Sequence, residues 1–367
     1  MKPQKTEFQV VKRVREYCLA TGQHGYKFIA LPGQQILERI LWVVVVLVGL
    51  AASIVMLCAA WGRKDMNSTL IALNTAHYPV WNIEFPAITL CGLNRIKKSR
   101  AIIVANEWTL PSGVTRDEVF NDLIFLSQLI DMDESNATKF GRLQSVLDMN
   151  NITATVALRE VMLPCEELLV KCKFKGKMIN CKKVFRLLET PYGFCCSFNY
   201  HANKPTTKEL IDTPSGITDR HLPYRMSACG HQLGLTVLVH NHIADYYDAS
   251  MASYGVKVLV HSPYDYPGDN TDEVMLSTGR MTLVSVYPEV FQTTADVRES
   301  SLQGRQCLLW EERILRSLQR YSYSNCYSEC RQNFSIHLCG CSPFYYPNLV
   351  LLSFAVGSST LPEKLCY

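Results

Sequence analysis

Residues 40–61 form one unbroken run of 22 residues without a charged side chain. At about 1.5 Å of rise per residue, a helix over this run is roughly 33 Å long, which is enough to cross the core of a bilayer. Such a length disfavours a buried helix of a soluble domain. The run also starts too late and is too long for a cleaved signal peptide. We therefore predict a transmembrane helix over residues 40–61.

Basic residues are concentrated before this segment, which predicts a cytoplasmic N-terminus. Only Arg63 and Lys64 follow it closely. The Asn-x-Ser/Thr sequons for glycosylation all lie after it, which agrees with this orientation. We therefore expect residues 1–39 in the cytosol and an extracellular ectodomain from residue 62. The basic residues are Lys2, Lys5, Lys12, Arg13, Arg15, Lys27 and Arg39, and the sequons are at Asn67, Asn136, Asn151 and Asn333.

Of the 15 cysteines, 13 lie beyond residue 61, on the side predicted to be extracellular. Disulfides are stable in that oxidising compartment. Cys195 and Cys196 are adjacent, so we expect them to bond to two different partners. The Cys-x3-Cys spacing at 326 and the Cys-x-Cys spacing at 339 would also suit zinc, but outside the cell they favour disulfides.

The ectodomain sequence predicts a mixture of helices and strands, an α+β fold. Pro86 indicates a short extended run over 82–91 that suits an edge strand. Thr115 and Glu118 form a capping box before an apolar face at helical spacing. Period-two alternation predicts the other strands. The expected helices are 116–131, 156–170 (interrupted by Pro164) and 307–320, and the expected strands are 235–239, 256–260 and 281–287.

Composition and motifs argue against an enzyme and against a nucleic-acid binder. Lysine and arginine together number 37 and the acidic residues 33, which is too balanced for a strongly basic protein. The chain has no Gly-x-Ser-x-Gly elbow and no Gly-rich phosphate loop. Asp131-Met132-Asp133 has the letters of the metal site of a type II membrane glycosyltransferase, but a solvated helix end is favoured. His240 and His242 share a strand face without a third metal ligand.

Several segments, in order along the chain, carry a resemblance to a known family. His24-Gly25 precedes the membrane segment, and later segments are rich in cysteine, glycine and proline. The later segments are FPAITLC (85–91), GFCCSFN (193–199), Gly234-Leu235, His261-Ser262-Pro263, YSYSNCYSEC (321–330) and CGCSPFYYP (339–347). The ordered series resembles the epithelial sodium channel/degenerin family, and its insect pickpocket branch in particular.

The resemblance implies a subunit of a trimeric, amiloride-sensitive sodium channel, gated by a ligand or another stimulus, in the plasma membrane. It implies a homo- or heterotrimer with related subunits, surrounded by lipid and conducting sodium ions, with no nucleic acid and no cofactor. The ectodomain would be a disulfide-rich clenched hand, with a central β-sheet and peripheral helices. His24 and Gly25 correspond to the family's gating pair. The expected disulfides are Cys91 with Cys195 and Cys172 with Cys181.

The end of the chain departs from the family pattern, in which a second membrane helix with a Gly-x-Ser motif forms the ion path. The apolar run 349–356 is roughly 12 Å long as a helix, too short to span a bilayer. Gly357-Ser358-Ser359 fits the motif by letters alone. We therefore expect an incomplete ectodomain over 62–347 and a divergent tail over 348–367. In the family, five thumb cysteines bond mainly to cysteines beyond this point; they match Cys307, Cys326, Cys330, Cys339 and Cys341.

Alternatives remain open at this stage. The chain is expected to carry no current by itself, so a truncated, non-conducting subunit that modulates related channels is one alternative. A type II membrane glycosyltransferase shares the topology, and an adhesion or receptor ectodomain would also fit the cysteines. The family motifs favour the channel subunit over these two.

Overall fold

The computed structural model describes residues 4–66, 69–130, 137–204 and 222–346. Contacts between residues divide the chain into two compact units. One unit comprises Met1–Asn74 and Gln292–Cys307, and the other comprises Thr75–Phe291 and Leu308–Tyr367. The two units are described separately below. The predicted tail over 348–367 lies outside the described residues.

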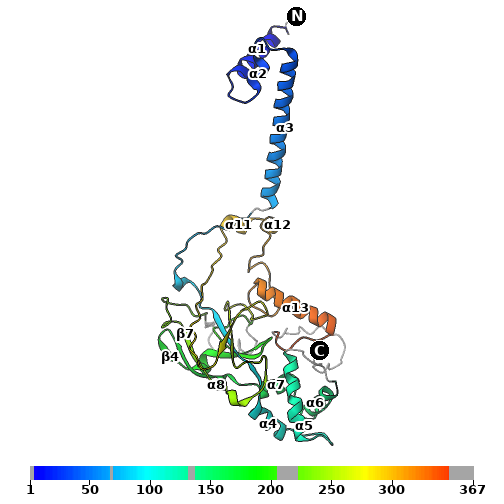
Figure 1. The fold of residues 1–367 in the computed structure, drawn as a ribbon, viewed down its shortest axis with the longest axis vertical. Coiled ribbons are helices and arrows are strands. Elements are labelled where there is room, and N and C mark those ends of the chain that lie inside the picture. The colour runs from blue at the N-terminus through cyan, green and yellow to red at the C-terminus, as the bar shows by residue number, and fades with distance from the viewer. Residues whose placement is uncertain (1–3, 67–68, 131–136, 205–221, 347–367) are drawn as a thin grey trace, which may run out of the picture. The chain divides into compact units, whose positions relative to one another are not determined.

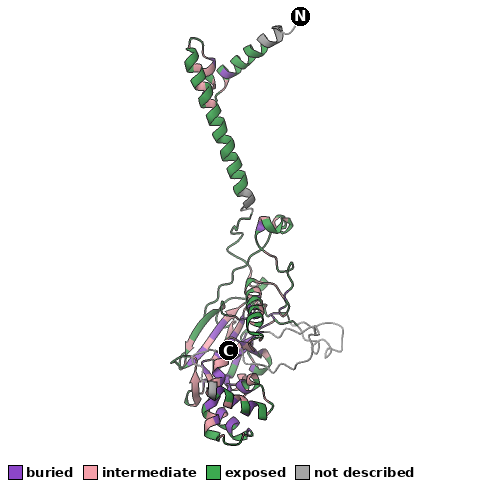
Figure 2. Ribbon diagram, turned by 90° about the vertical axis from the view of Figure 1, so that its right-hand side faces the viewer, coloured by how far each residue is buried: buried purple, intermediate pink, exposed green. Residues whose placement is uncertain are grey.

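The first unit contains the apolar helix that the sequence predicts. Helix α3 spans Ile36–Met66, so it includes residues 40–61 and is longer at both ends. Its stretch Ile36–Arg63 is long and apolar enough to cross a membrane, and its most apolar window is not buried. Figure 2 shows this helix as exposed over most of its length. The other helices of this unit are α1 (Gln4–Ala20), α2 (Tyr26–Ala30), α11 (Ala295–Glu299) and α12 (Leu302–Arg305).

The second unit is built on a five-stranded antiparallel sheet in the order β10-β9-β1-β6-β5. Strand β1 therefore lies in the middle of the sheet, and the edge position that the sequence suggested for it is wrong. Pro86 is tolerated because it precedes the strand, where its missing N–H leaves no ladder bond unmade. The strands are β1 (Ala87–Gly92), β5 (Phe185–Thr190), β6 (Gly193–Phe198), β9 (Gly255–His261) and β10 (Asp272–Ser277).

The other strands described in this unit form two smaller sheets. One has the order β4-β3-β7, and the other pairs β2 with β8. The strands predicted at 235–239 and 256–260 are confirmed, but β7 and β9 belong to different sheets. Together with the helices, these sheets confirm the α+β class. The strands are β2 (Asn94–Lys97), β3 (Leu169–Phe174), β4 (Lys177–Ile179), β7 (Leu235–Val239) and β8 (Tyr246–Ala249).

Helices α4, α5, α6 and α7 gather at one end of this unit and enclose the largest apolar core (Figure 1). The predicted capping box is present: the Glu118 N–H donates to Thr115 Oγ1, and the Thr115 N–H donates to Glu118 Oε2 at 2.9 Å. The helix predicted over 116–131 continues as a 3-10 helix, whose three-residue period places the buried Leu123 and Leu126 on one face. The elements are α4 (Lys98–Glu107), α5 (Arg116–Asp122), η2 (Leu123–Leu129), α6 (Ala137–Met149) and α7 (Ala154–Val161).

Pro164 interrupts the helix predicted over 156–170, as expected. Helix α7 ends before it, a single turn follows it, and strand β3 then begins. The longest helix of the unit, α13, carries the Cys-x3-Cys spacing, and the apolar pattern does not predict it. The remaining helices are η1 (Val80–Asn82), α8 (Cys165–Leu168), α9 (Cys181–Val184), η3 (Ile243–Asp245) and α13 (Tyr323–Cys339).

Two predicted elements are wrong. Residues 281–287 form no strand, and their apolar side chains are exposed: Met281 by 84% and Tyr287 by 87%. Residues 307–320 form turns rather than a helix. Their backbone instead pairs with residues 202–204, where the Gln319 N–H donates to the Ala202 carbonyl at 2.8 Å. Tertiary pairing thus overrides a local apolar pattern.

Candidate functional site

The gating pair expected at residues 24 and 25 lies at the start of helix α2. Gly25 has φ +93°, in the region that favours glycine, and it is buried. A Cβ atom placed on Gly25 would lie 2.8 Å from Val46 Cγ2 and 3.8 Å from Trp42 Cε3, both on α3. Backbone conformation and close approach therefore both require glycine here. At Gly25, the segment N-terminal to α3 therefore packs directly against that helix.

An aromatic pair extends the same contact. The Phe28 ring stacks on the Trp42 ring, with centroids 4.5 Å apart and planes inclined by 21°. Trp42 and Val46 are four residues apart and so share one face of α3. The contact thus joins α2 to that face, so a displacement of either helix must be accommodated by the other. In the sequence, only Gly25 and the four-residue spacing of Trp42 and Val46 could have suggested the contact between α2 and α3.

His24 is exposed, and within the described ranges its side chain makes no hydrogen bond to the protein. The structure thus brings Gly25 close to α3, whereas His24 is exposed. A role for His24 in gating remains a prediction.

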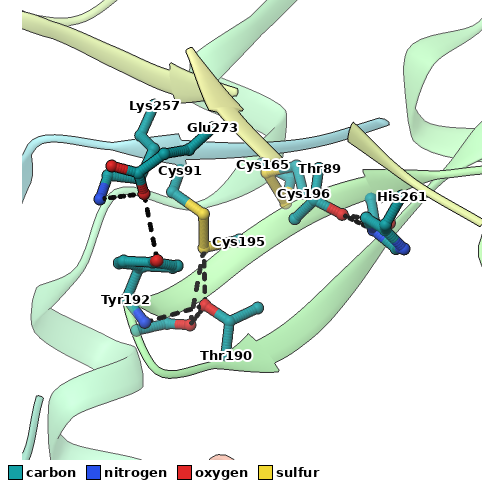
Figure 3. Close-up of a disulfide and its surroundings, with 12 residues drawn as sticks. Thr89, Cys91, Cys165, Thr190, Tyr192, Cys195, Cys196, Lys257, His261 and Glu273 are labelled. Carbon is teal, nitrogen blue, oxygen red and sulfur yellow. Dashed lines mark hydrogen bonds and ion pairs between the residues drawn. A yellow bond between two sulfur atoms is a disulfide. The ribbon is translucent and has the colours of Figure 1, made fainter. Parts of the chain in front are cut away.

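Three disulfides have both of their cysteines among the described residues of the second unit, and Figure 3 shows the first two. Cys91 and Cys195, on the neighbouring strands β1 and β6, are bonded with their Cα atoms 4.6 Å apart. Cys196 points to the other face of β6, since successive side chains alternate, and is bonded to Cys165 of α8. The third bond joins Cys172 to Cys181. Two of the three bonds are the pairs that the resemblance implies, and the adjacent cysteines have different partners.

The late cysteines are mostly free thiols. Cys326, Cys330 and Cys339 lie on α13 and, like Cys307, are unbonded, whereas Cys341 is disulfide-bonded. In the part of the chain that the structure describes, no group of three or more His, Cys, Asp or Glu side chains is placed to hold a metal ion. His240 and His242 lie with ring centroids 4.1 Å apart.

A cluster beside the first disulfide ties three strands together. The Lys257 ammonium of β9 lies 2.8 Å from Glu273 Oε2 of β10 and 3.9 Å from the centroid of the Tyr192 ring, at the turn before β6. The Tyr192 hydroxyl donates to the same Glu273 oxygen at 3.1 Å. Burial, together with the Glu273 carboxylate, raises the pKa of Tyr192 to about 12. Figure 3 shows this cluster on one side of the Cys91–Cys195 bond.

A second group of hydrogen-bonded side chains, from strands β9, β1 and β6, lies on the same sheet. His261 Nδ1 lies 3.0 Å from the Ser262 carbonyl, which can only accept, so Nδ1 carries the proton. Nε2 then accepts from the Thr89 hydroxyl at 2.9 Å, and Thr89 accepts in turn from the Ser197 hydroxyl at 2.7 Å. Burial lowers the pKa of His261 to about 4.

The lowered pKa of His261 predicts that the folded protein loses stability in acid. The pKa of His261 is about 4 when folded and 6.5 when unfolded, so the unfolded chain binds the proton first as pH falls. The stabilisation is present above pH 6.5 and is lost as pH falls toward 4. We expect thermal unfolding of His261→Gln to depend less steeply on pH across this window than that of the wild type. The exposed His231→Gln is the control, and equal slopes for the wild type and His261→Gln would contradict the prediction.

The sequons differ in their surroundings. Asn151 is exposed just after α6, with φ +53°, in the surface turn that glycosylation favours. Asn333 is half-buried within α13. Asn67 and Asn136 lie outside the described residues, as does the Asp131-Met132-Asp133 motif.

Comparison with known proteins gives a consistent result. The family described as "Amiloride-sensitive sodium channel" matches residues 17–365. "Sodium channel protein Nach" of Drosophila melanogaster is 24% identical over 360 residues, covering 94% of this chain and 67% of that protein. "Pickpocket protein 28" of the same species is 25% identical, covering 95% and 58%. "Bile acid-sensitive ion channel" of Rattus norvegicus is 26% identical, covering 90% and 60%. The chain thus spans between about half and two thirds of the length of such curated relatives.

Proposed function

Because the chain belongs to the amiloride-sensitive sodium channel family, we propose that it acts as a subunit of a sodium-conducting channel in the plasma membrane. The match over residues 17–365 carries this proposal, since it includes the apolar helix, the sheet and the disulfides. The family consists of ion channels, which is consistent with the chain not being an enzyme.

The proposed subunit has residues 1–39 in the cytoplasm, a membrane helix over 40–61 and the extracellular ectodomain over 62–347. It assembles as a homo- or heterotrimer with related subunits, and amiloride blocks the resulting current. We assign His24 and Gly25 to gating. The contact of Gly25 with Val46 supports a coupling between this segment and α3.

The function is tested by expressing the 367-residue chain in oocytes, alone and with Pickpocket protein 28. We expect the two proteins to copurify and the amiloride-sensitive sodium current of the oocytes to change in size or kinetics when this chain is added. A failure to copurify, together with an unchanged current, would contradict the proposal. A robust current from the chain alone would instead contradict the non-conducting alternative.

The proposed orientation is tested at Asn151. We expect the wild-type chain to migrate faster after endoglycosidase treatment, and Asn151→Gln to lose part of that shift, because glycans are added only on the extracytoplasmic side. Thr153→Ser is the matched control, since it keeps both the sequon and a hydroxyl at the start of α7. A wild-type chain without an Asn151-dependent shift would contradict an extracellular ectodomain.

A further inference from the structure

The second unit contains a cavity of about 520 Å³ between helices α7 and α8 on one side and strand β5 and helix α9 on the other. Pockets that bind small organic molecules are typically about 300–1,000 Å³ in volume. None of the residues assigned above to gating or glycosylation lines this cavity. The cavity is therefore separate from the features that support the proposed function.

Two disulfides hold its walls. Cys165 and Cys181 both line the cavity, the first at the start of α8 and the second at the start of α9. Their bonds to Cys196 and Cys172 fix these short helices to strands β6 and β3. Because the walls are covalently held, the cavity exists before any ligand binds.

Its floor is apolar. Met162, Phe185 and Phe194 line it and are almost fully buried. Two apolar side chains remain open to solvent at its edge: Val156, which is 46% exposed, and Leu187, which is 39% exposed. An apolar ligand body would remove this surface from water, which is favourable.

The lining contains three cationic side chains and two carboxylates. Lys182 is paired with Glu166 at 2.7 Å, and the Arg100 guanidinium donates to the Glu160 carbonyl at 2.9 Å. Arg159 is exposed and makes no hydrogen bond or ion pair with another described residue. Burial raises the pKa of Glu189, and the positive charge of Arg159 opposes this shift by lowering that pKa. Of the three lining cations, Arg159 is therefore the one without a hydrogen bond or ion pair to another described residue.

We propose that this cavity binds a small organic anion with an apolar body. The carboxylate or sulfonate of the ligand pairs with Arg159, and its apolar body packs on Leu187 and Phe185. An arginine fork suits such a group because it presents two parallel N–H donors to two oxygens. The apolar floor contributes binding affinity, and the Arg159 guanidinium favours ligands that carry a negative charge.

The test uses 2-naphthoate as the probe, with the uncharged 2-naphthamide as its matched analogue. Saturation binding is measured on the full chain in lipid nanodiscs, after subtraction of binding to empty nanodiscs. We expect saturable binding of 2-naphthoate that is at least about tenfold tighter than that of 2-naphthamide. Arg159→Glu is expected to weaken 2-naphthoate binding by at least about tenfold and to leave 2-naphthamide binding within about twofold.

The matched control is Arg186→Glu. Arg186 is an exposed arginine of the same strand as Leu187 but on the opposite face, and it does not line the cavity. This control is expected to bind 2-naphthoate like the wild type. Equal affinity for the two probes, unaffected binding in Arg159→Glu, or no saturable binding to the folded chain would overturn the proposal. The readout requires no current, so it is independent of the test of channel function.

Discussion

In the proposed channel, Gly25→Ala is expected to reduce the sodium current by at least about tenfold. An alanine with φ +93° costs about 1–2 kcal/mol of backbone strain. The new Cβ atom, 2.8 Å from Val46 Cγ2, adds about 1–3 kcal/mol of overpacking. Since about 1.4 kcal/mol is a tenfold change in an equilibrium constant, the packed arrangement of α2 on α3 becomes a minor state. The current is measured per channel, normalised to the amount of protein at the cell surface.

Two controls separate the causes of this effect. Gly33 has φ +89°, but a Cβ atom placed on it would have nothing within 4 Å, so Gly33→Ala carries the backbone cost alone. It is expected to reduce the current less than Gly25→Ala. Val46→Ala in the Gly25→Ala background removes the clashing methyl group and should restore part of the current. Wild-type current in Gly25→Ala at normal surface levels would show that this contact does not influence conduction.

Local chemistry accounts for the features that could be predicted from the sequence. The 22 uncharged residues at 40–61 have few alternatives to a membrane helix, and α3 includes them. The capping box at Thr115 is a contact between residues three apart, so it depends on little else. Cys195 and Cys196 had to point to opposite faces once they lay in a strand. Each of these inferences needed only neighbours in the sequence.

The failures required knowledge of neighbours in space. The alternation at 281–287 tells which side chains share a face, but not whether another strand is beside them. The apolar spacing at 307–320 is typical of a helix face, whereas Leu315 and Leu318 pack in turns against Tyr200 and Tyr266. Likewise, the contact of Gly25 with α3 depends on how the chain turns between residues 31 and 35. Pattern alone cannot supply such pairings.

Replacing Cys91 and Cys195 together by alanine is expected to destabilise the second unit by about 3–5 kcal/mol. The two cysteines are 104 residues apart, and in the chain-entropy account a bond that closes a loop of about 100 residues contributes about 4.7 kcal/mol. Both side chains are almost fully buried, so alanine avoids placing a polar group in the core. Because domains have only about 5–15 kcal/mol of stability, little of the variant should reach the cell surface. Urea unfolding of the purified chain gives the free energy directly.

The three disulfides together distinguish two explanations for this stabilisation. If the bonds act through the unfolded chain, the losses should follow the sequence separations of 104, 31 and 9 residues. The Cys172 and Cys181 double alanine variant should then be the mildest, and the Cys165 and Cys196 variant intermediate. If the bonds act through the folded sheet, Cys91–Cys195 should matter least, because the ladder of β1 with β6 already holds its two cysteines close together. A smaller loss for that pair than for Cys172–Cys181 would therefore reject the unfolded-chain explanation.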